Sequence, residues 1–285
     1  MKKIALLISF SFFTIGFLLN APVEQTINST VEKNLPSKCK SNPINFSLSF
    51  FPLPTLSSHS ISISSLCSGL PNDLYFKGVE LKSRGLSFSP FGLKFKVSLQ
   101  TKKNKTIDLF LAVGFGGFKI VMDNTLLPNE IFSSFAGNIL ELEGDLNLNL
   151  ISRIDKKGIK ELSFKVKGVN ISLPGQSISG FSIPTIDLDP IELKGNIDKR
   201  KNLKLESISV GSENNNLKLR GKGNISNIQN FKKSTISFLG SLQIFGELKT
   251  QFGFLNLVFG EESENGGFEF ELTGPIQAPR IKSLN

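Results

Sequence analysis

The chain has 285 residues, enough for one large domain or two ordinary ones, and its apolar fraction of 39% excludes global disorder. Lys and Arg number 33 against 24 Asp and Glu, so the net charge is +9 and favours an anionic partner. The basic residues stand singly between apolar ones and do not cluster with aromatic side chains. We therefore expect solvated strand faces and no nucleic-acid partner.

An uncharged run, residues 4–19, follows Lys2-Lys3 at the amino terminus. As a helix it would be about 24 Å long, somewhat less than a hydrocarbon core of about 30 Å, so a signal peptide and a short anchor both fit. Cleavage after Ala21 would put Leu19 where a small side chain is needed, so we favour an uncleaved anchor. The residues expected to hold it in the membrane are Ile4, Leu6, Leu7, Phe10, Phe12, Phe13, Ile15, Phe17, Leu18 and Leu19.

Both positive charges precede the apolar run, and the next Lys or Arg is Lys33. Because positive flanks stay in the cytoplasm, we expect a single-pass protein of a bacterial inner membrane with its bulk in the periplasm. We divide the chain into a membrane anchor or signal sequence at 1–22, a short helical connector at 23–35 and a periplasmic β-rich domain at 36–285. Apolar residues recur at every fourth position of the connector, which predicts a helix ending at Pro36.

The two cysteines, Cys39 and Cys67, flank a serine-rich segment. In an exported chain such a pair predicts one disulfide, which would stabilise the fold by about 3–4 kcal/mol; two unpaired thiols are the alternative. A metal site would need further ligands, and the only histidine, His59, has no partner histidine, so we expect no metal and no cofactor.

Beyond Pro36 the dominant apolar period is two, as in residues 44–50, 91–99, 107–115 and 140–150. Shorter alternating runs follow as far as residue 219, separated by glycine, asparagine and proline turns. The pattern predicts a mainly β fold, a long curved antiparallel sheet that is folded over and groove-like, with one N-terminal membrane helix and one or two short helices.

The apolar parity changes after Gly168 and at Asp189-Pro190, and each change predicts a β-bulge that returns the apolar set to one face. Helical signals occur at residues 127–139 and, mixed with period two, near 241–250, where we expect a helix followed by a strand.

The last residues, 268–285, alternate like a strand until Gly274-Pro275 and Pro279 interrupt the pattern. We expect a last strand whose glycine lets the chain turn and whose prolines protect a sheet edge. A disordered tail from Gly274 is the alternative.

Residues 140–150, 159–175, 183–197 and 270–281 together resemble the bacterial type II secretion system protein N family, and more remotely the AsmA-like proteins. The resemblance covers the anchor and the chain from Val79 onward. It implies an inner-membrane anchor, a periplasmic β-rich domain and other type II secretion subunits as partners. AsmA-like proteins add elongated sheets that curl into apolar grooves. Residues 36–71 have no counterpart in the family.

Catalytic candidates are few, and we expect no enzyme activity. No nucleophile has an evident base. Asp187 and Asp189 could pair as in a glycosidase, but the polar face of a strand explains them better. The glycines of 114–117 fit a hairpin, and residues 261–267 fit a solvated turn.

Three classes of function fit the pattern. The first is a non-catalytic assembly or scaffold component of type II secretion. The second is a lipid-binding or lipid-transfer protein, with acyl chains of phospholipid or lipopolysaccharide against an apolar groove. We expect that groove on the face carrying Phe164, Val166, Ile171 and Leu173, with Gly168 correcting the register. The third, an outer-membrane barrel, lacks its aromatic girdles because the chain has one Tyr and no Trp.

Overall fold

The structure is a computed structural model that describes residues 24–25, 28–29, 45–50, 53–64, 73–131, 142–156, 158–178, 181–198, 201–212, 215–227, 233–253, 255–276 and 278–284. The predicted anchor at 4–19 and the predicted bridge between Cys39 and Cys67 lie outside these residues. Within them, no helix is both long and apolar enough to cross a bilayer. The connector is helical where it is described, at 24–25 and 28–29.

The fold is mainly β, as the sequence predicts, and is dominated by one antiparallel sheet of fifteen strands. Fourteen follow one another in the order β1-β2-β5-β6-β7-β8-β9-β10-β14-β15-β16-β17-β18-β19, and β13 pairs with β10. Two small hairpins, β3-β4 and β11-β12, complete the set.

Most strands pair with their neighbours in sequence. The strands of the first half are β1 Ser47–Ser49, β2 Thr55–Ser58, β3 Ile61–Ile63, β4 Leu74–Phe76, β5 Gly78–Phe88, β6 Phe91–Gln100, β7 Thr106–Gly114, β8 Gly117–Pro128, β9 Glu143–Asp155 and β10 Gly158–Leu173. The second half contributes β11 Gln176–Ile178, β12 Phe181–Ile183, β13 Ile186–Asp187, β14 Ile191–Ile197, β15 Leu203–Val210, β16 Leu217–Ser226, β17 Thr235–Ile244, β18 Gly267–Pro275 and β19 Arg280–Ser283.

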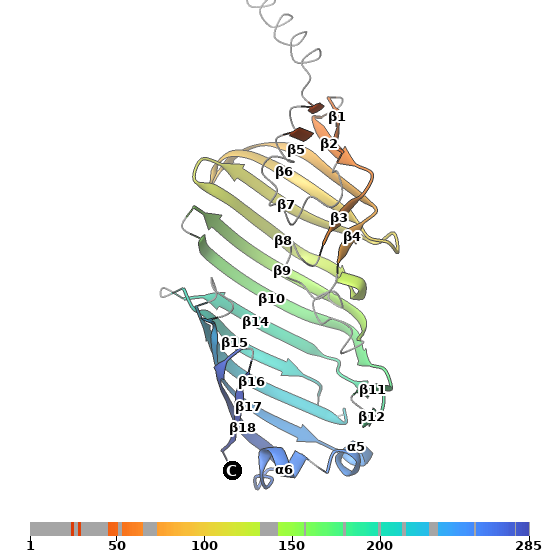
Figure 1. Cartoon of the computed structure of the whole chain (residues 1–285), viewed down its shortest axis with the longest axis vertical. Helices are drawn as coiled ribbons and strands as arrows, with labels where there is room; N and C mark the ends of the chain where they lie inside the picture. Colours follow the sequence, from red (N-terminus) through yellow and green to blue (C-terminus); the bar gives the residue numbers. More distant parts are fainter. Residues whose placement is uncertain are drawn as a thin grey trace, which may run out of the picture.

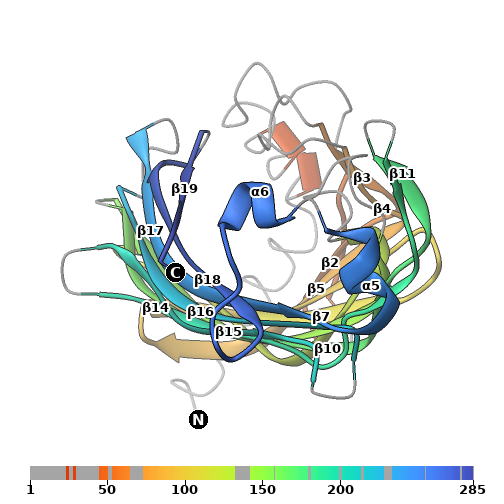
Figure 2. The same cartoon turned by 90° about the horizontal axis from the view of Figure 1, so that it is seen from below.

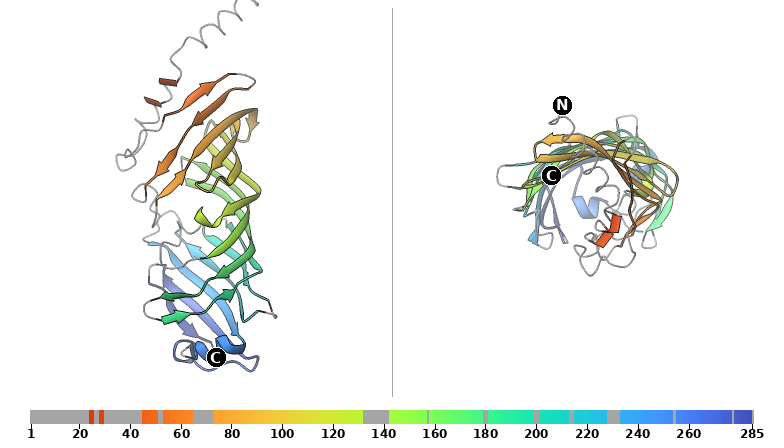
Figure 3. Two further views of the ribbon diagram at one scale, coloured as in Figure 1. Left: turned by 90° about the vertical axis from the view of Figure 1, so that its right-hand side faces the viewer. Right: turned by 90° about the horizontal axis from the view of Figure 1, so that it is seen from above.

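The sheet is elongated and curled. Its strands run obliquely across the long axis of the molecule (Figure 1). Seen along that axis, they form a curved wall with the helices α5 (Gly246–Gln251) and α6 (Leu255–Phe259) on its concave side (Figure 2). The same curvature is visible from the other end (Figure 3). Antiparallel pairing puts alternate residues on opposite faces, so the apolar set lines the concave face and the polar set the convex one.

Long strands with bulges replace several of the short strands that the sequence predicts. In β10 the residues before and after the parity change form one strand, as expected, but the bulge is not at Gly168, which pairs with Leu146 in normal register. The register shifts between Val169 and Ser172, where Asn170 adopts φ 53°. Val169 therefore stays on the outer face, and the apolar set returns to the inner face only at Ile171.

The helical expectations need two corrections. The predicted helix at 241–250 begins later, because Ser241–Ile244 still belongs to β17 and pairs with β16 and β18. The strand expected after it is a second helix, α6. The other predicted helix, at 127–139, is helical at 129–131, and its remainder lies outside the described residues.

The carboxyl terminus forms a hairpin. β18 stays paired with β17 through Gly274, which adopts φ 105°, and Pro275; the chain then turns and returns as β19 along β18. The reversal therefore follows Pro275 rather than Gly274, where it was predicted, and the sheet edge is β19 rather than the strand before the prolines. This edge strand has four residues and carries the exposed side chains of Arg280 and Lys282.

The opposite edge strand, β1, is bound by side chains of the connector. Asn28 accepts a hydrogen bond from the main-chain N–H of Phe46 (2.9 Å) and donates one to its carbonyl (3.3 Å). The main-chain N–H of Leu48 donates to Glu24 (2.6 Å). Three main-chain groups that an edge strand would leave open are therefore occupied.

Candidate functional site: the apolar concave face

A continuous row of directly paired residues crosses nine strands, from β8 to β19, on the concave face. Directly paired residues of antiparallel strands point to the same side, so the row is one surface feature. At about 4.8 Å per strand, its eight steps extend for about 38 Å. The row consists of Met122, Leu150, Phe164, Gly195, Leu205, Gly223, Phe238, Leu272 and Ile281.

Phenylalanine rings lie over glycines on this face. Phe164 is paired with Gly195, and a Cβ built on that glycine would be 2.7 Å from the ring. The same holds for Phe270 beside Gly240, at 2.6 Å. The ring of Phe238 covers Gly221. Each ring thus fills the space that its neighbour leaves, and the curled sheet has a continuous apolar floor.

Parts of the concave face are covered. In the amino-terminal half, Ile61, Ile63, Leu74 and Phe76 of the β3-β4 hairpin pack with Val79, Ile107 and Met122 of the large sheet. In the carboxyl-terminal half, Leu248 of α5 packs against Ile244, and Phe259 of α6 lies 5.2 Å from Phe270 and 5.7 Å from Phe268 between ring centroids.

Between the two covered parts lies what we call the central window, on strands β9, β10 and β14. Its side chains are all half-buried, so each keeps part of its apolar surface exposed. Leu148 pairs with Val166, and Val166 pairs with Leu193, so a second row runs beside the first. The window consists of Leu148, Leu150, Phe164, Val166 and Leu193.

The four residues predicted to line a groove separate into two pairs. Phe164 and Val166 belong to the central window. Ile171 and Leu173, beyond the bulge, are 1% and 7% exposed, and Leu173 packs with Ile186 and Leu248. They lie in the core and contribute no accessible lining. The other window residues were among the alternating runs, but only the register of the folded sheet places them beside Phe164.

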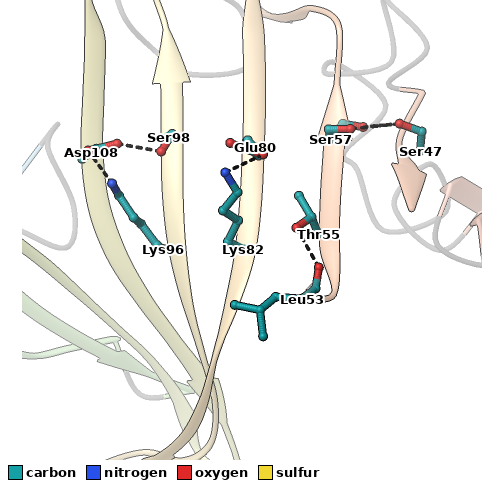
Figure 4. Close-up of polar contacts among 9 residues, drawn as sticks. All are labelled: Ser47, Leu53, Thr55, Ser57, Glu80, Lys82, Lys96, Ser98 and Asp108. Carbon is teal, nitrogen blue, oxygen red and sulfur yellow. Dashed lines mark hydrogen bonds and ion pairs between the residues drawn. The ribbon is translucent and has the colours of Figure 1, made fainter. Parts of the chain in front are cut away.

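The convex face carries a polar row in the first half of the sheet, shown in Figure 4. Ser47, Ser57, Glu80, Ser98 and Asp108 are successive partners across five strands. All of them except Ser47 border a hollow of about 450 Å³. Ser47 and Ser57 are in hydrogen-bond contact at 2.9 Å.

The charges of this polar row are paired with each other (Figure 4). Lys82 lies 3.0 Å from Glu80, and Lys96 lies 2.7 Å from Asp108, which also accepts a hydrogen bond from Ser98 at 2.6 Å. Partial burial acts to raise the pKa of Asp108, but the hydrogen bonds from Lys96 and Ser98 outweigh it, so this pKa lies below its ordinary value. These groups therefore stabilise the fold and leave no charge free for a ligand.

A second convex hollow, of about 380 Å³, lies over β15 and β16 and is lined by Lys204, Glu206, Lys222 and Asn224. Glu206 accepts hydrogen bonds from Lys194 at 2.9 Å and Asn196 at 2.6 Å. The bond from Lys194 holds the pKa of Glu206 below its usual value. Leu205 and Leu239 also line this hollow, so it combines charged and apolar groups.

Of the catalytic candidates, Asp187 ends strand β13, and Asp189 lies in the turn that follows. Asp187 accepts a hydrogen bond from the main-chain N–H of Asp189 at 3.0 Å, and Asn215 donates to the carbonyl of Asp189 at 2.6 Å, so both aspartates shape a turn. Residues 114–117 form the β7-β8 hairpin, as predicted. The turn at 261–267 is closed by hydrogen bonds between Ser263 and Gly267. In the described part of the chain, no group of three or more His, Cys, Asp or Glu residues is placed to hold a metal ion.

No family model, no curated protein and no solved structure matches this chain. The resemblance to the type II secretion system protein N family therefore stays a prediction from sequence.

Proposed function

We propose that the chain is a non-catalytic lipid-binding protein whose concave sheet face forms an apolar groove for acyl chains. The observation that carries the proposal is the central window, whose half-buried apolar side chains lie within the apolar row that crosses nine strands. Met122, Leu205 and Phe238 of that row are only 7–8% exposed, so an acyl chain would contact the row at the central window, which covers three strands or about 10 Å.

The central window is where an acyl chain would first contact the protein. Its five side chains are half-buried aliphatic or aromatic groups, and their pairing partners on the same face are apolar or glycine except for Thr125, the β8 partner of Leu148. Covering them removes apolar surface from water, which favours binding by about 25 cal/mol per Å². We place this protein, as the sequence predicts, at the inner membrane of a bacterium with the sheet in the periplasm, where phospholipid and lipopolysaccharide are the available ligands.

The test is photo-crosslinking in cells that produce the full chain. A photoreactive amino acid replaces Val166 in the window, and the matched control replaces Lys165, the next residue, which points to the convex face. We expect lipid adducts from position 166 and none from position 165. Adducts of equal yield at both positions, or no lipid at position 166, would reject the groove.

A second candidate is the assembly role in type II secretion, which the sequence resemblance suggests. Its structural support is the contrast between the two sheet edges: β1 is bound by Glu24 and Asn28, whereas no further described strand pairs with β19. A secretion subunit would add a strand to β19. Crosslinking from Ile281 should then yield adducts with that machinery. Lipid adducts alone would count against this role.

A further inference from the structure

Two neighbouring hairpin ends form an exposed apolar surface, here called the rim patch. They are the β5-β6 and β7-β8 turns, at the same side of the sheet (Figure 1). Phe88 and Phe115 are 85% and 89% exposed, and Leu86 and Phe91 are 64% and 59% exposed. Such exposure is unusual for large apolar side chains that gather in one place. The patch consists of Leu86, Phe88, Phe91, Leu93, Val113 and Phe115.

The two hairpin ends are built as one unit. Gly92 and Gly114 are directly paired, and a Cβ on either would overlap the main chain of the other strand. The main-chain N–H of Phe115 donates to the carbonyl of Phe91 at 3.0 Å. The close approach of β6 and β7 leaves room only for glycine at both positions and brings Phe91 and Phe115 together, and Phe88 of β5 pairs directly with Phe91.

Basic side chains lie behind the rim patch. The hairpin ends of β5-β6, β7-β8 and β9-β10 carry six basic and two acidic side chains in their described residues, a net charge of +4. The basic residues are Arg84, Lys94, Lys119, Arg153, Lys156 and Lys160, and the acidic ones are Asp155 and Glu161. Lys119 and Arg153 are direct cross-strand partners. Neither forms an ion pair with a residue that the structure describes. Like charges in direct opposition destabilise a sheet; Glu161 of β10, the other direct partner of Arg153, offsets part of this repulsion, and an anion near Lys119 would relieve the rest.

We propose that this rim docks onto a lipid bilayer with anionic headgroups, with Phe88, Phe91 and Phe115 entering the interface. The spacing fits such a surface. Lys119 pairs with Ala112, three residues before Phe115, which puts the basic row about 10 Å behind the tip at 3.3 Å per residue. Apolar groups of interfacial proteins enter by about 5–10 Å. The phenylalanines would therefore reach the acyl boundary while Lys119 and Arg153 contact headgroups. This docking is independent of the concave groove and would hold if that groove bound nothing.

The chain has no tryptophan, so a single substitution introduces a specific fluorescent probe. The experiment uses the full chain with Phe115→Trp in vesicles of phosphatidylethanolamine and phosphatidylglycerol, with bromine on the acyl chains as a quencher. The matched control is Leu257→Trp, at an apolar residue of α6 that is 90% exposed. Both variants keep the amino-terminal segment, so any tethering through it is the same in both.

We expect bromolipid quenching and a blue-shifted emission for Phe115→Trp, and neither for Leu257→Trp. Neutralising Lys119 and Arg153 with glutamine should lower the ratio of docked to undocked protein roughly 30-fold. Emission that is not quenched in these vesicles would overturn the proposal. So would quenching that is unchanged in phosphatidylcholine, because the charge would then play no part. A blue shift that depends on protein concentration, without quenching, would instead identify the rim patch as a contact between copies of this chain.

Discussion

The pairing of phenylalanine rings with glycines predicts that a single methyl group will destabilise the sheet. At Gly221 an added Cβ would overlap Cζ of Phe238 and lie 2.8 Å from the carbonyl oxygen of Leu239. Phe238 is buried and contacts Phe270, with 6.0 Å between ring centroids. The ring cannot move away without disturbing a second ring.

The expected magnitude follows from two opposing effects. Overpacking a core position costs about 1–3 kcal/mol. Replacing glycine also removes freedom from the unfolded chain, which returns about 0.4–1 kcal/mol. We expect Gly221→Ala to lower the free energy of unfolding by about 1–2 kcal/mol. Each kcal/mol should lower the melting temperature by about 2–4 °C. Gly175→Ala is the matched control, because the nearest atom to its added Cβ is Thr185 Oγ1 at 3.6 Å.

The assay is urea unfolding of the full chain in mild detergent, followed by far-ultraviolet circular dichroism. Replacing the ring of Phe238 with the smaller side chain of leucine should make room for the methyl group. The double variant should then lose less unfolding free energy than the sum of the two single variants, by about 0.5–3 kcal/mol. If Gly221→Ala lost no more stability than Gly175→Ala, or if the double variant were simply additive, the ring would not be filling the space over the glycine.

Three further outcomes are expected. Phe164→Asp puts an unpaired carboxylate into the central window and should lower the melting temperature and remove lipid adducts; retained adducts at full stability would contradict the groove. Because the pKa of Asp108 is held below 3.8 in the folded chain, its pairing with Lys96 stabilises the fold above that pH and is lost as the pH falls through the folded-state value. In urea titrations across the acid range, Asp108→Asn should therefore lose less unfolding free energy on acidification than the parent protein. The difference should be below about 1 kcal/mol, because the pair is so exposed. Asn28→Ala should weaken the capping of β1 by about 1 kcal/mol and speed amide exchange at Phe46; unchanged exchange in mass spectrometry would argue against the cap.

The alternation of apolar residues was sufficient to predict the antiparallel sheet and the face of each strand, because the period of two is local. It did not locate the β10 bulge. The apolar parity changes beside Gly168, but Asn170 takes the left-handed conformation and Gly144, across the ladder, adopts φ 95°. The partner strand decides which of several neighbouring residues forms the bulge, and the apolar pattern of a single strand does not contain that information.

The candidate site was predicted only in part, again because the pattern of one strand does not give its register with the neighbouring strands. Phe164 and Val166 were assigned to the apolar face from β10 alone, but their neighbours in the central window come from other strands and require the register. The rim patch was missed because Phe91 and Phe115 continue the alternation of core residues. Their exposure arises at the ends of the hairpins, where the sheet has no further strand or helix to cover them in the described part of the chain.

The occupied edge at β1 limits how copies of this chain could join through their sheets. Growth of an open fibre by strand addition is head-to-tail, and it requires two different free edges on every copy. With the main-chain groups of Phe46 and Leu48 held by Asn28 and Glu24, β19 is the end of the fifteen-stranded sheet that can receive a strand, as far as the structure describes that sheet. Two copies could meet β19 to β19 around a twofold axis, and that pairing would consume the last free edge of each. Association through these two described sheet ends would therefore stop at a dimer, and they would not build a fibre.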